Sequence, residues 1–115
     1  MYDLEDRLVR FAANIILFAK VFPKDCGGNT LEDQVIRSSV SAALNYGEAQ
    51  SAESSKDFIH KMSIVLKELK ETRVALKISG HIKYGEINTL SLLQKENGEL
   101  IAICATRIKN RKMQN

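Results

Sequence analysis

Apolar side chains recur every three or four residues along most of the chain, which is the spacing of one face of an α-helix. Short segments containing Gly, Pro or Ser separate four such stretches. These stretches predict helices at about residues 4–22, 30–50, 56–78 and 86–109. We therefore expect one domain spanning residues 1–115, an all-α, up-and-down antiparallel four-helix bundle.

The first predicted helix is apolar almost all round from Phe11 onward. Beside its main seam runs a second apolar stripe of Ala12, Ile16 and Ala19. A helix in a small bundle exposes one side to solvent, so apolar residues on every side indicate a further contact. We expect that contact to be made with another subunit.

Several positions bear on where the helices end. Pro23 should end the first helix, and Gly27–Gly28 should lie in the following loop. Thr30, with Asp33 three residues later, resembles a capping box. Gly80 suits the residue that follows a helix, whereas Asn97–Gly98 is either a tolerated irregularity or a turn that splits the fourth helix.

The charge is distributed unevenly along the chain. Residues 1–55 hold five Lys/Arg and eight Asp/Glu, whereas residues 56–115 hold twelve Lys/Arg and six Asp/Glu. Such asymmetry suits a surface that binds polyanions, or the pairing of acidic and basic faces between subunits. A basic C-terminal turn also complements the dipole of the last helix.

The composition favours a cytoplasmic protein. The acidic start lacks the basic and apolar segments of a secretory signal, and the most apolar stretch, residues 11–22, is too short to span a bilayer. We expect no membrane association. In a reducing compartment Cys26 and Cys104 should remain free thiols.

Polar residues follow the small-residue seam of the second helix at steps of three and four, so they share one face. Two carboxylates on the third helix, three residues apart, need a cation, and Arg37 is the candidate on the facing helix. These groups predict an inter-helix polar network, within one subunit or between two, although a solvated face would show the same spacing. Its residues are Arg37, Ser41, Asn45, Glu48, Glu68 and Glu71.

The same residues resemble a family motif. In the bacterial four-helix bundle proteins encoded within intervening sequences of 23S ribosomal RNA genes, the second helix typically reads Q-x-x-R-S-x-x-S-x-x-x-N-x-x-E. Their third helix carries an aromatic residue near its start and E-x-x-E-T later. The matching residues here are Gln34, Arg37, Ser38, Ser41, Asn45 and Glu48, then Phe58, Glu68, Glu71 and Thr72.

The resemblance extends from Leu8 to about Lys112. It implies an up-down-up-down bundle that assembles as a homopentamer, with a biochemical role that is mostly unassigned. One similar branch serves reverse transcriptases of diversity-generating retroelements as a nucleic-acid-binding accessory factor. RNA or DNA binding is therefore the alternative to a non-enzymatic scaffold role, and its candidate contacts are Lys67, Lys70, Arg107, Lys109, Arg111 and Lys112.

We expect no enzymatic activity, metal or cofactor. A di-iron bundle needs two Glu-x-x-His pairs and two further carboxylates, but the sequence offers one comparable pair, Asp57 with His60. No nucleophile with an adjacent base can be nominated for hydrolysis or acyl transfer. An acidic cluster at Glu48, Glu68 and Glu71 could have shifted pKa values, as structural networks also do.

Overall fold

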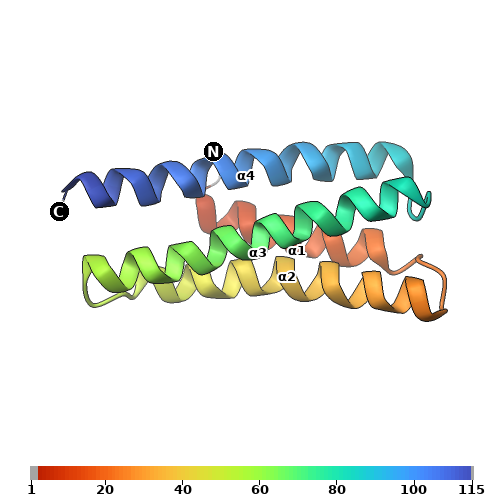
Figure 1. The fold of residues 1–115 in the computed structure, drawn as a ribbon, viewed down its shortest axis with the longest axis horizontal. Coiled ribbons are helices and arrows are strands. Elements are labelled where there is room, and N and C mark those ends of the chain that lie inside the picture. The colour runs from red at the N-terminus through yellow and green to blue at the C-terminus, as the bar shows by residue number, and fades with distance from the viewer. Residues whose placement is uncertain (1–2, 115) are drawn as a thin grey trace.

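The computed structural model describes residues 3–114, which form four α-helices: α1 (Leu4–Ala19), α2 (Cys26–Gln50), α3 (Ser55–His81) and α4 (Ile87–Gln114). The helices run along one long axis and alternate in direction (Figure 1). No strand occurs in this range. The fold class predicted from the hydrophobic pattern is therefore confirmed.

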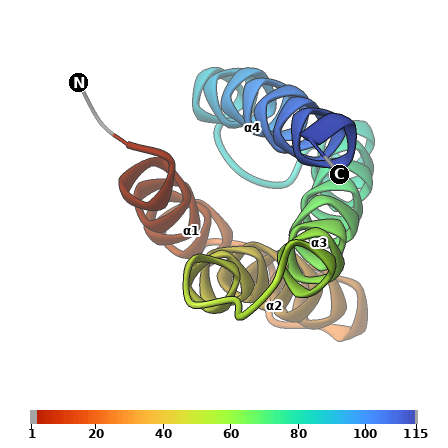
Figure 2. The same ribbon diagram turned by 90° about the vertical axis from the view of Figure 1, so that its left-hand side faces the viewer.

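Each helix packs against its neighbours in sequence, and α1 also contacts α4. Within the described range, α1 does not contact α3, and α2 does not contact α4. The end-on view in Figure 2 shows the resulting order α1, α2, α3, α4 around the bundle. Helices α1 and α3 therefore occupy diagonally opposite corners.

The core follows the predicted seams of the four helices. The largest buried apolar side chains come from every helix and lose almost all contact with solvent, which supplies the main driving force for folding. They include Leu8, Phe11, Ile15, Met62, Leu69, Leu76 and Leu100.

Helix α1 ends three residues before its predicted end, although the chain stays packed. Phe22 lies outside the helix but is buried, with its ring centroid 5.4 Å from that of Phe18 and 5.6 Å from that of Tyr84. Apolar spacing continues past Ala19 because the turn still faces the core. The pattern therefore reported burial there and not helical conformation.

Helix α2 begins four residues before its predicted start, so Gly27 and Gly28 belong to its first turn. Asp25 is the N-cap, and its carboxylate accepts a hydrogen bond from the Gly28 amide at 2.8 Å. An Asp at this position satisfies an amide that lacks a helical partner. The predicted capping box at Thr30 was wrong, because that residue is already helical.

The turn between α3 and α4 differs in detail from the prediction. Helix α3 continues past Gly80 to His81, and the left-handed backbone conformation occurs at Lys83 (φ 60°) and Gly85 (φ 82°). A β-carbon at Gly85 would lie 2.3 Å from the Phe18 ring. The tight approach of this turn to α1, more than the end of α3, therefore requires glycine.

Helix α4 continues without a break through Asn97–Gly98 and reaches Gln114, five residues beyond its predicted end. Glu86 accepts hydrogen bonds from the Asn88 and Thr89 amides at 2.9 and 2.8 Å. The bond from the Asn88 amide lowers the pKa of Glu86 most, and the bonds from Thr89 add to this. Of the two readings of Asn97–Gly98, the uninterrupted helix is the one found.

Helix α1 is short, with 16 residues, whereas α2, α3 and α4 have 25, 27 and 28. Figure 1 shows that α1 starts part-way along the bundle, so one end consists of α2, α3 and α4 alone. That end carries the α2–α3 connection and the C-terminal turns of α4. It is the part of the molecule where a fourth helix does not cover the packed faces.

Candidate interaction surfaces

Arg37 joins α2 to α3 through two carboxylates. Its guanidinium donates to Glu68 at 3.1 Å and to Glu71 at 3.3 Å, and also to the Gln34 side-chain oxygen at 3.3 Å. The Glu68 side chain is 9% exposed, whereas Arg37 and Glu71 are 45% and 42% exposed. The group therefore lies at the rim of the α2–α3 interface, with one carboxylate buried.

The two carboxylates titrate in opposite directions because they share one site. Burial alone would raise the pKa of Glu68, but hydrogen bonds with Glu71 and Ser41 and the charge of Arg37 outweigh it, so the pKa is lowered. The hydrogen bond with Glu68 raises the pKa of Glu71. Glu68 is thus the carboxylate that Arg37 holds ionised.

The remaining predicted network residues lie apart from this group or at its edge. Asn45 donates to the Ser41 backbone oxygen at 2.9 Å and to its hydroxyl at 3.1 Å, so this pair stays within α2. Glu48 accepts from Lys61 at 2.8 Å. The predicted six-residue stripe therefore divides into an Arg37 group, a local α2 contact and a separate surface ion pair.

Two buried polar contacts were missed in the sequence. The hydroxyls of Ser38 and Thr72 lie 2.7 Å apart between α2 and α3. Asn97 is fully buried and donates to the Leu69 backbone oxygen at 3.1 Å, while its side-chain oxygen finds no partner within the described residues. Their positions on the apolar seams are the signal that could have identified them.

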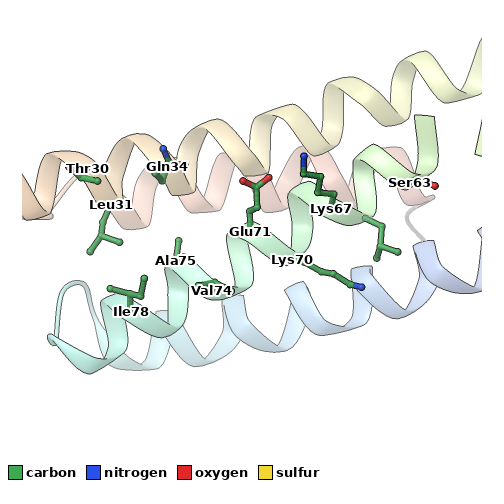
Figure 3. A pocket seen from close by; sticks show the side chains of 11 residues that line it. Thr30, Leu31, Gln34, Ser63, Lys67, Lys70, Glu71, Val74, Ala75 and Ile78 are labelled. Atoms are coloured by element: carbon green, nitrogen blue, oxygen red, sulfur yellow. The ribbon is translucent and has the colours of Figure 1, made fainter. Parts of the chain in front are cut away.

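A groove of about 770 Å³ lies along α2 and α3, and we call it the α2/α3 groove. Figure 3 shows Leu31 of α2 opposite Ala75 and Ile78 of α3, with Glu71 and Lys67 further along. Its rim contains both carboxylate and ammonium groups. Its apolar lining consists of Leu31, Leu66, Val74, Ala75 and Ile78.

The predicted candidates Lys67 and Lys70 line this same groove. Both are exposed, and neither forms a salt bridge with any residue in the range 3–114. They are therefore free to meet a negatively charged partner at one end of an apolar surface.

The outward side of α1 carries the second apolar surface, which we call the α1 ridge. Its residues recur at helical spacing along the exposed side, and Leu17 and Val21 are 57% and 66% exposed. Exposed apolar side chains gathered on one face indicate a contact surface. The α1 ridge consists of Val9, Ile16, Leu17 and Val21.

Beside the α1 ridge, α1 and α4 are joined by one charged cluster. Arg7 donates to Glu96 at 2.6 Å and to Glu99 at 3.0 Å. The hydrogen bond with Glu96 is the main cause of a raised pKa at Arg7. Clefts of about 520 and 460 Å³ on either side of Leu92 and Leu93 show that the two helices are not closely packed there.

The C-terminal turns of α4 place two arginines against aromatic rings. Arg107 donates to the Tyr46 hydroxyl at 2.8 Å, and the Arg111 guanidinium lies 3.9 Å from the centroid of the Phe58 ring. Lys109 and Lys112 are exposed. The four candidate contacts therefore divide into two arginines held against the bundle and two lysines in solvent.

The described residues contain no group of three His, Cys, Asp or Glu side chains that could hold a metal ion. Cys26 is exposed and Cys104 is buried, and both are free thiols. Burial raises the pKa of Cys104 to about 11, against a smaller opposing effect of Arg107. Cys104 is therefore a core residue that stays protonated at neutral pH.

The sequence profile of the 23S rRNA-intervening sequence protein family matches residues 3–106. The chain belongs to this family. Membership explains the ordered polar motif on α2 and α3, because Arg37, Glu68 and Glu71 of that motif meet at one helix interface. No curated protein matches the sequence.

A solved structure has the same fold as this family member. It is a protein of unknown function from the S23 ribosomal protein family of Bacteroides thetaiotaomicron, 27% identical in sequence, with a TM-score of 0.85. The match covers 93% of this chain and 99% of the other. Within residues 3–114, none of the helices combines the length and apolar character needed to cross a membrane.

Proposed function

We propose that the protein is a non-enzymatic, cytoplasmic scaffold that works as a homo-oligomer. The observation that carries this proposal is the apolar surface left uncovered by the chain's own packing. The α1 ridge and the α2/α3 groove both expose large apolar side chains on a bundle whose core is already filled. Scattered exposed apolar residues are ordinary, but surfaces of this kind favour protein contacts.

The proposed stoichiometry is a homopentamer, and that number derives from the family resemblance. Light scattering and native mass spectrometry at low micromolar concentration should give an assembly larger than a dimer, with five chains as the expected species. Raising the salt concentration should leave most of it intact, because burial of apolar surface is not screened by ions. A monomer across the micromolar range would refute the proposal.

Nucleic-acid binding is the second candidate function. It is supported by the basic end of α4, where Arg107, Lys109, Arg111 and Lys112 occur together and no acidic residue follows Glu99. In an oligomer, each basic end is repeated, so weak phosphate contacts would add through avidity. Arg111 already stacks on Phe58, so these contacts would be made to phosphates more than to bases.

The test of this candidate compares Lys109→Gln with Lys112→Gln as a double variant against the native chain. Fluorescence anisotropy with single-stranded RNA and duplex DNA should show binding that weakens linearly in log–log form with salt. The double variant should have a smaller salt slope, by up to about two contacts. Identical salt slopes for the two proteins, or no binding at low salt, would exclude this basic end as the interface.

A further inference from the structure

We infer that the α2/α3 groove receives the α1 ridge of a second copy of this chain. This inference rests on the proposed homo-oligomeric function and specifies its interface. The groove is an open apolar depression between two helices, and the ridge is a single helix with an apolar outward side. An apolar helix face laid into a groove between helices is a common mode of protein recognition.

Charge complementarity selects α1 as the occupant. The first turn of α1 is acidic, with Glu5 and Asp6 exposed to solvent. One end of the groove is basic, with Lys67 and Lys70 unpaired among the described residues. An acidic turn followed by an apolar ridge therefore matches a basic end followed by an apolar floor.

The spacing of charge and apolar surface also agrees in length. Glu5 precedes Ile16 by 11 residues, about 16 Å along a helix. Lys67 precedes Ile78 by the same 11 residues. If the partner's α1 lies parallel to α3, the acidic turn meets the lysines while the ridge meets the apolar floor.

The two surfaces lie on different sides of one bundle, because α1 and α3 occupy diagonal corners (Figure 2). One partner then covers the groove while another covers the ridge. The contact is heterologous, which means that each copy offers two different surfaces. Repetition of such a contact produces a closed ring or an open filament, and a two-fold dimer through one shared patch is excluded.

The test uses two variants, each of which removes one surface at exposed positions. The ridge variant carries Val9→Glu with Leu17→Glu, and the groove variant carries Val74→Glu with Ile78→Glu. The control is Leu44→Glu, an exposed apolar residue of α2 that belongs to neither surface. Circular dichroism should show native helicity for all three, since no core side chain changes.

Light scattering should show the native chain and the Leu44→Glu control as assemblies, and each surface variant alone as a monomer. An equimolar mixture of the two surface variants should form a one-to-one dimer, because only one intact ridge and one intact groove remain. If the native chain is itself a monomer, the proposed function fails. If it assembles but the mixture stays monomeric, or the variants still assemble, the ridge-and-groove contact fails alone.

A charge exchange tests the parallel register. Glu5→Lys with Asp6→Lys should weaken assembly about tenfold, as should Lys67→Glu with Lys70→Glu. All four changes in one chain should restore most of the loss, since opposite charges again meet. Failure of the combined chain to recover, with both pairs individually weakened, would overturn the parallel register.

Discussion

Replacing Gly28 with alanine should lower the free energy of unfolding by about 3 kcal/mol, with a melting temperature lower by roughly 10 °C. A β-carbon at this position would lie 1.7 Å from the Pro23 backbone oxygen and 2.7 Å from its carbonyl carbon. Because the obstructing atoms are backbone, the α1–α2 turn itself must move. That movement would also disturb the Asp25 cap. Thermal and urea unfolding measure the loss.

The matched control is the same substitution at Gly98, where a β-carbon would meet nothing within 4 Å. Alanine there should stabilise α4 by about 0.5–1 kcal/mol, because glycine inside a helix costs conformational entropy. Both variants must be compared at equal protein concentration, since assembly raises apparent stability. Equal unfolding curves for the Gly28 and Gly98 variants would refute the steric argument.

The different roles of Gly28 and Gly98 show what the sequence could predict about the fold. Apolar periodicity predicted four helices and their inward faces because it depends only on spacing along one element. Whether a glycine opens a helix, lies inside one or occupies a turn depends on atoms from another segment. Gly28 was therefore placed in a loop, although the Pro23 carbonyl requires it in the first turn of α2.

The candidate site followed the same rule. Spacing placed Arg37 and Glu48 on one face of α2, but it could not give the rotation of α3 against that face. Arg37 meets Glu68 and Glu71, whereas Glu48 meets Lys61 nearer the end of the bundle. The uncovered surfaces were only partly foreseen. The apolar α1 was visible in the sequence, but the α2/α3 groove depends on how two helices cross.

Replacing Arg37 with alanine should lower the free energy of unfolding by about 2 kcal/mol at neutral pH. Loss of one partner from a buried ion pair costs about 3–5 kcal/mol and loss from a surface pair under about 1. Arg37 is between these cases, since its side chain is 45% exposed while that of Glu68 is 9% exposed. Urea unfolding of both proteins measures the difference.

Lys61→Ala is the control, since it removes an ion pair to Glu48 whose side chain is 58% exposed. Its cost should remain below about 0.5 kcal/mol. An Arg37→Ala variant no less stable than this control would show that the Arg37 group is solvated and contributes nothing to the helix interface.

The loss from Arg37→Ala should depend on pH in a direction fixed by Glu68. The pKa of Glu68 is lowered in the folded protein, so its stabilising contribution is present above the unfolded pKa and lost as the pH falls through the folded pKa. The gap between native and variant should therefore shrink below about pH 4. Adding Glu71→Gln to the variant should recover stability at neutral pH, because it removes one of two carboxylates left without a cation. A gap that stays constant from pH 7 to 3 would show that Arg37 acts through packing and not through charge.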